Sequence, residues 1–229
     1  YLMEEIIFEA QKREFYHVLM EILNLKKYFV GIRKNIEIFN EIGKEILFYE
    51  VCFKALVNAQ EKYYVFILKT GYAHGLSEKE FEYYIKSSIL ELENDYKKTG
   101  SESVNYYLHI FNFAYSEFKK NYPQAIEHCL SLKALLLKNT SIFKKERLGF
   151  IYNNLCLFNS MLGEFDEALR YIKKAKTYFI TNSHNSLMND IEQFRVIFTM
   201  KKYNESEIVI NNIFGHKNND SGTFVKYKK

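Results

Sequence analysis

Apolar residues recur along the chain at the three- and four-residue spacing of amphipathic helices, and short polar stretches separate these segments. The pattern predicts about ten helices that pair as five antiparallel hairpins. In chain order the predicted pairs are 2–24 with 27–40, 44–71 with 78–98, 102–119 with 123–138, 142–162 with 166–180, and 185–200 with 205–215. The sequence therefore predicts an all-α fold.

Some of the predicted helix ends carry specific signals. Ser77 and Glu80 have the spacing of a capping box, in which each side chain accepts a hydrogen bond from the backbone of the other residue. Gly100 follows the same predicted helix and suits a left-handed C-terminal cap. Gly43 is expected to break the chain between the first two hairpins.

A short motif recurs four times: a large apolar residue, a polar turn, an aromatic residue and, three positions later, a small residue. A small side chain lets two helices cross at the usual distance of about 8 to 10 Å. Each hairpin would leave one apolar face for its neighbour to cover, so the motif predicts a stacked helical solenoid. The aromatic and small residues of the four copies are Tyr28 and Gly31, Tyr122 and Ala125, Phe165 and Ala168, and Tyr203 and Ser206.

Residues 149–180 resemble a tetratricopeptide repeat, whose pattern is W-x2-L-G-x2-Y, then A-x3-F, then P. The positions that fit are Tyr152 in place of Trp, Leu155, Ala168 and Ala175. The positions that depart from the pattern are Cys156, Asn159 and Ile180, which replace Gly, Tyr and Pro. The resemblance implies a right-handed α-solenoid of about five degenerate hairpins over residues 1–215.

In this family the first helix of each hairpin lines a concave face that binds peptides or proteins. The resemblance, carried over in the register of Ala168, implies a partner-binding set of Tyr107, Ile110, Phe150, Asn153, Leu157, Ile191 and Arg195. An Asn amide can pair with peptide groups and an Arg can bind a carboxylate, so we expect an extended or helical peptide, or a protein, as partner.

The same residues have plainer interpretations, which stay open at this point. Asn153 suits an ordinary polar position on a helix, and Arg195 suits an ion pair between repeats. Tyr107 and Phe150 suit packing positions, because the chain has 19 Tyr and 20 Phe to accommodate.

Five degenerate hairpins also resemble the C-terminal sensor domain of bacterial peptide-responsive transcription factors. That resemblance implies a ligand on the concave face and a helix-turn-helix domain before the repeats. The chain shows no such motif and does not begin with Met, so this alternative predicts a DNA-binding domain before Tyr1.

Composition and charge agree with a helical globular protein. The chain has 48% hydrophobic residues, nine Gly and one Pro, too few turn-forming residues for an all-β protein. Its formal charge is +4, of which residues 216–229 carry +3 from four Lys and one Asp. We therefore predict a disordered basic tail at 216–229. The remainder has no concentrated basic face, and we expect it not to bind nucleic acid directly.

Catalytic and metal-binding patterns are absent from the sequence. No Gly-rich phosphate loop occurs, and no two of the six His lie three or four residues apart. The three Cys form no C-x-x-C pair and suit buried, reduced thiols. We therefore expect no cofactor, no metal and no enzymatic activity.

The sequence also bears on localisation. No run of about 18 apolar residues occurs and the first residues lack the order of a signal peptide. We expect a cytoplasmic protein that does not enter a membrane. Its oligomeric state is left open, a homodimer included.

Overall fold

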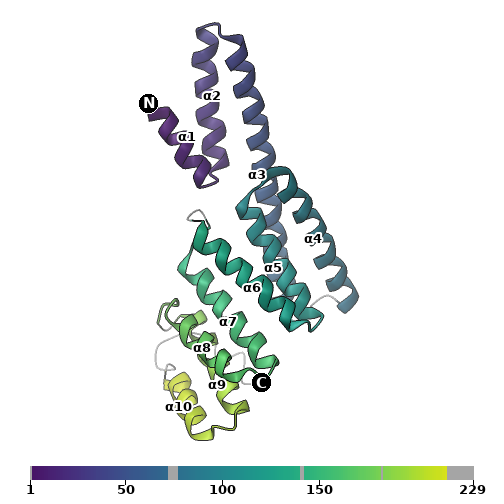
Figure 1. Ribbon diagram of the computed structural model, residues 1–229, viewed down its shortest axis with the longest axis vertical. Coiled ribbons are helices and arrows are strands. Elements are labelled where there is room, and N and C mark those ends of the chain that lie inside the picture. The colour runs from purple at the N-terminus through teal and green to yellow at the C-terminus, as the bar shows by residue number, and fades with distance from the viewer. Residues whose placement is uncertain (1, 72–76, 140–141, 182, 216–229) are drawn as a thin grey trace. The chain divides into compact units, whose positions relative to one another are not determined.

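The computed structural model describes residues 2–71, 77–139, 142–181 and 183–215, and that part of the chain contains ten helices and no strand (Figure 1). The predicted all-α fold is therefore confirmed. The predicted tail at 216–229 lies outside the described residues. The helices are α1 (Leu2–Lys12), α2 (Tyr16–Ile32), α3 (Ile36–Gly71), α4 (Glu78–Thr99), α5 (Glu102–Phe118), α6 (Tyr122–Lys138), α7 (Lys145–Met161), α8 (Phe165–Lys176), α9 (His184–Thr199) and α10 (Tyr203–Gly215).

The chain divides into two compact units. Unit 1 comprises Tyr1–Asn121 and Leu130–Phe143, and unit 2 comprises Tyr122–Cys129 and Lys144–Lys229. In both units, helices that follow one another in the sequence pack together, as α2 does with α3 and α7 with α8.

The same turn precedes five of the helices. Its central residue has a positive φ angle, between 54° and 82°, and the next helix begins two residues later. The residue after it donates its N–H to the carbonyl five positions back, as Glu164 does to Asn159 at 2.9 Å, which is the Schellman arrangement. The central residues of these five turns are Glu14, Lys34, Lys120, Gly163 and Lys201. Only one of them is a glycine.

Three of the four predicted small residues occupy equivalent positions. Ala125, Ala168 and Ser206 are each the fourth residue of the helix that follows this turn, and all three are buried. Gly31 does not belong to this group, because it lies near the exposed end of α2. The polar pair Lys26 and Lys27 had predicted a turn there, but these residues lie inside α2.

The boundaries predicted between residues 2 and 44 are wrong, whereas the end at residue 71 and the helix 78–98 agree with the structure. The predicted helix 2–24 is interrupted by the turn at Glu14, and the turn that follows α2 lies at Lys34. Gly43 does not break the chain, because α3 runs without interruption for 36 residues from Ile36 to Gly71. The apolar pattern continues through Gly43, and the neighbouring Ile42 is buried against α1 and α2.

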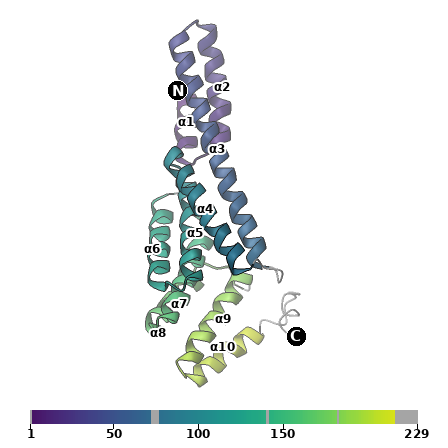
Figure 2. The same ribbon diagram turned by 90° about the vertical axis from the view of Figure 1, so that its right-hand side faces the viewer.

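Unit 1 is built along α3. The first half of α3 packs against α1 and α2, and its second half packs against α4 and α5 (Figures 1 and 2). Aromatic contacts join the second half of α3 to α5. The ring centroids of Tyr63 and Tyr107 are 5.5 Å apart, and those of Phe66 and Phe111 are 5.4 Å apart.

Both expected end signals of α4 are present. Ser77 and Glu80 form the predicted capping box, and Gly100 has a left-handed φ of 63°. These two predictions are confirmed.

A distant carboxylate caps α5. Glu14 accepts hydrogen bonds from the backbone N–H groups of Glu102 (2.7 Å) and Ser103 (2.9 Å), and from the hydroxyl of Ser101 (3.3 Å). A carboxylate at this place satisfies N–H groups that have no partner within the helix, and it is favoured by the helix dipole.

Unit 2 contains two hairpins of consecutive helices, α7 with α8 and α9 with α10. The second hairpin packs against the first through contacts of α9 with α7 and α8. Ala168 and Ile172 of α8 are buried together with Cys156 of α7 and Val196 of α9. Gly149 permits the close approach of Phe179, whose ring a Cβ atom at this position would strike.

Candidate functional site

The exposed face of α7 carries four side chains that are candidates for contacting a partner. Phe150, Asn153, Asn154 and Leu157 lie at helical spacings of three and four, so they share one face. The opposite face of α7 is buried, which fixes the direction in which this set points. Phe150 is 41% exposed, and Asn153 and Leu157 are half-buried.

A buried amide joins α7 to α9. The Nδ2 group of Asn189 donates to Asn153 Oδ1 (2.8 Å) and to the carbonyl oxygen of Ile172 (3.2 Å). Asn189 is fully buried and Asn153 is half-buried, so the bond holds the exposed side of α7 beside α9. Asn189 was not among the residues predicted from the sequence, although an amide among the apolar positions of a helix is a signal for a buried hydrogen bond.

On α9, Met188, Ile191 and Arg195 share one face at spacings of three and four. Ile191 is half-buried, and Met188 and Arg195 are exposed. Arg195 makes an ion pair with Glu192 on its own helix, at 3.1 Å. The Arg195 side chain is 67% exposed, so most of its surface remains accessible to a partner.

We call this set the α7–α9 surface and define it as Phe150, Asn153, Leu157, Met188, Ile191 and Arg195. All six belong to unit 2. Five of them were predicted from the sequence, and Met188 adds an apolar side chain one turn before Ile191.

The structure corrects the assignment of Tyr107 and Ile110. Both side chains are buried in unit 1, and the Tyr107 ring packs against Tyr63 and Tyr106. Their prediction had assumed that each hairpin repeats the spacing of the one around Ala168. The long helix α3 breaks that regularity, because its second half packs against α5.

Cys156 and His128, in the described part of unit 2, have pKa values shifted by burial. Burial raises the pKa of the Cys156 thiol to about 12, and burial lowers the pKa of His128. A thiol with so high a pKa is a poor nucleophile near neutral pH. Within the described residues, no three His, Cys, Asp or Glu side chains lie close enough to share a metal ion.

None of the described helices combines the length and the hydropathy that a membrane span requires.

No known protein family matches the sequence, and no curated protein is similar to it at a significant level.

Proposed function

We propose that the chain is a non-catalytic binding module that takes a peptide or a protein segment on the α7–α9 surface. The observation that carries the proposal is the Asn153–Asn189 hydrogen bond, which joins α7 to α9, the two helices that carry these side chains. The tetratricopeptide-like solenoid belongs to the same proposal. Its support is the recurring turn and the packing of consecutive helices.

The apolar and the polar side chains of the α7–α9 surface have different roles in binding. Phe150, Leu157 and Ile191 offer partly exposed apolar area that a partner can cover. Apolar anchors of this kind supply most of the affinity in peptide recognition, and polar groups at the edge supply orientation. Arg195 suits that second role, because its guanidinium can take a carboxylate of the partner in place of Glu192.

The test starts with binders selected from a library of random peptides displayed against the whole chain. Affinities of the selected peptides are then measured by calorimetry for the native protein and for the double variant Phe150→Ala with Arg195→Ala. We expect the double variant to bind at least about tenfold more weakly, a loss of about 1.4 kcal/mol. The Asn153–Asn189 bond is left intact so that the fold is preserved.

A matched control removes one apolar and one basic side chain elsewhere in unit 2. Ile208 of α10 is 64% exposed and Lys173 of α8 is exposed, so Ile208→Ala with Lys173→Ala is the control variant. Equal affinity of the native protein and the Phe150/Arg195 variant would show that the peptides bind elsewhere. Failure to select any peptide would contradict the binding role itself.

A further inference from the structure

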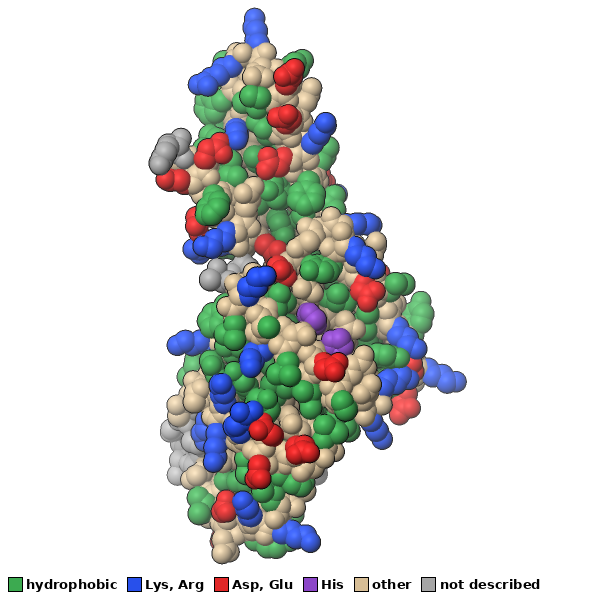
Figure 3. Space-filling model, viewed as in Figure 1, with side chains coloured by type: hydrophobic (Ala, Val, Ile, Leu, Met, Phe, Trp, Pro, Cys, Tyr) green, Lys and Arg blue, Asp and Glu red, His purple; other side chains and the backbone are tan. Residues whose placement is uncertain are grey.

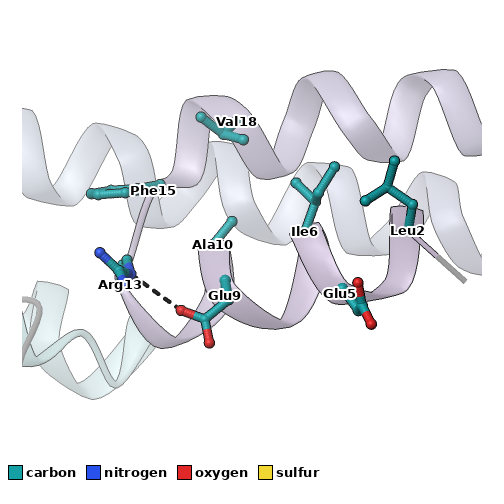
Figure 4. A pocket seen from close by; sticks show the side chains of 8 residues that line it. All are labelled: Leu2, Glu5, Ile6, Glu9, Ala10, Arg13, Phe15 and Val18. Carbon is teal, nitrogen blue, oxygen red and sulfur yellow. Dashed lines mark hydrogen bonds and ion pairs between the residues drawn. The ribbon is translucent and has the colours of Figure 1, made fainter.

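An apolar groove of about 390 Å³ lies between α1 and α2 in unit 1 (Figure 4). Leu2, Ile6 and Ala10 of α1 point toward α2, where Val18 faces them, and Phe15 closes one end (Figure 4). Leu2 is 70% exposed, so the wall formed by α1 is open to solvent. Glu5, Glu9 and Arg13 of α1 also line the groove, and Glu9 and Arg13 form an ion pair (Figure 4).

The apolar lining continues along α2 beyond the end of α1. Leu25, Phe29 and Ile32 follow Val18 on the same helical face and are 46%, 49% and 61% exposed. The first turn of α1 lies beside Lys26, because Glu4 forms an ion pair with it at 2.8 Å. The remainder of the α2 face has no helix over it among the described residues.

We call this strip the α1–α2 seam; its members are Leu2, Ile6, Phe15, Val18, Leu25, Phe29 and Ile32. From Val18 to Ile32 it extends about 21 Å along α2, at about 1.5 Å per residue. Hydrophobic side chains also reach the surface around α1 and α2 in the space-filling view (Figure 3). A contiguous apolar strip of this length on a protein surface is typical of an interaction site.

Charges of opposite sign flank the two ends of the seam. Beside its α1-covered half lie the ion pairs of Glu9 with Arg13 and of Glu4 with Lys26, and the exposed carboxylates of Glu5 and Glu21. Arg33 and Lys34 lie just beyond Ile32 at its other end, and they are exposed as well. A second seam laid antiparallel on the first would bring the basic end of one copy to the acidic half of the other. A parallel arrangement would bring like charges together.

We propose that the α1–α2 seam is the interface of a homodimer, in which two copies pack α2 against α2 in antiparallel orientation. This arrangement is self-complementary, as a two-fold symmetric interface requires. The apolar strip forms its centre and the charged ends form its rim, the usual composition of stable interfaces. The proposal is independent of the peptide-binding role of unit 2.

The first experiment measures the mass of the chain in solution by analytical ultracentrifugation, between about 1 and about 100 µM. We expect twice the chain mass of 27.4 kDa at the upper end. Phe29→Glu should weaken self-association by at least about a hundredfold, because it places a charge in the apolar centre. Circular dichroism and thermal unfolding check that the variant is folded, which we expect because Phe29 is half exposed.

The control is Leu47→Glu, which introduces the same charge at a residue of α3 that is 62% exposed and lies outside the seam. The control should associate as the native chain does. A monomer throughout the concentration range, or a dimer that Phe29→Glu leaves unchanged, would overturn the proposal. If the chain stays monomeric but binds an added acidic amphipathic peptide, and Phe29→Glu abolishes this binding, then the seam binds a helix of another protein. This result would also overturn the homodimer proposal.

A charge exchange tests the orientation. Arg33→Glu alone and Glu21→Lys alone should each weaken the dimer by about tenfold, because each places like charges together across the interface. The two changes combined should restore the native association, since opposite charges then meet again. Absence of this restoration would rule out the antiparallel arrangement.

Discussion

Asp190 is a carboxylate that folding removes from water. Its side chain is 5% exposed, whereas that of its ion-pair partner Lys176 is 54% exposed, and the two lie 2.6 Å apart. The desolvation cost therefore falls mainly on the carboxylate, which depends on Lys176 for its counter-charge, whereas the Lys176 ammonium keeps much of its contact with water. This asymmetry decides which of the two substitutions is harmful.

Lys176→Met should lower the free energy of unfolding by about 2 kcal/mol, because it leaves a buried carboxylate without its cation. Asp190→Asn should cost less, since a neutral amide needs no counter-charge in the same place. Urea unfolding of the two variants measures the order of the effects. A larger loss for Asp190→Asn would mean that the carboxylate stabilises the fold through contacts other than Lys176.

Glu82 of α4 predicts a dependence of stability on pH. Its carboxylate accepts hydrogen bonds from the ammonium groups of Lys119 and Lys86, at 2.7 and 2.8 Å, and these bonds hold its pKa near 2 instead of 4.5. A lowered folded-state pKa stabilises the native protein fully above the unfolded value. The contribution is then lost as the pH falls from about 4.5 toward 2.

The corresponding variant is Glu82→Gln. It should be less stable than the native chain at pH 7, and the difference should shrink steadily below about pH 4.5. Added salt should reduce the difference at pH 7, because this site is accessible to solvent. Thermal unfolding at several pH values measures both trends. A difference that stays constant with pH would show that the lysines do not favour the charged form of Glu82.

At the scale of helices, the apolar periodicity was sufficient to predict an all-α fold but not every boundary. The turns at Glu14 and Lys34 were missed because neither residue is a Gly, although both adopt a left-handed conformation. The Schellman hydrogen bonds stabilise these turns once the helices around them have packed. Tertiary packing therefore fixed boundaries that local preferences alone left undecided.

Gly43 offers a direct test of helix continuity, because the structure places it inside α3. Gly43→Ala should raise the free energy of unfolding by about 0.5 to 1 kcal/mol, the usual gain within a helix. An added Cβ would lie 3.0 Å from the Lys27 ammonium, which is the mobile end of a long side chain and can shift. A loss of stability in denaturant unfolding would instead indicate that α3 bends or breaks at this residue.

Ala168 tests whether small residues are required where α8 meets its neighbours. It is fully buried beside Cys156 of α7 and Val196 of α9. Ala168→Leu should therefore lower the free energy of unfolding by about 1 to 3 kcal/mol through overpacking. Lys173→Leu is the matched control, because it introduces the same side chain at an exposed position of the same helix. Similar stabilities of the two variants would contradict close packing at Ala168.

At the scale of the whole molecule, the outcome for the predicted site residues differs between the two units. Phe150, Asn153, Leu157, Ile191 and Arg195 came from the region that resembles a repeat most clearly, and all five lie on α7 and α9 of unit 2, at exposed or half-buried positions. Tyr107 and Ile110 were placed by extending the same spacing into unit 1, where α3 occupies the expected opening. A regular spacing along the sequence predicts regular environments only while each hairpin has the same length.

Glu14 links segments of unit 1 that are far apart in the sequence. Replacing it tests whether the two compact units unfold independently of each other. Glu14→Gln weakens the acceptor of three hydrogen bonds from residues 101–103 and should lower the stability of unit 1 by about 1 to 3 kcal/mol. In proteins built from consecutive packed helices, stability is a sum of local terms, so a local change need not spread. Amide hydrogen exchange should therefore become faster in α1–α5 and remain unchanged in α7–α10. Glu41→Gln, at an exposed carboxylate of α3, is the control. Equal acceleration in both units would show that the chain unfolds as one cooperative body.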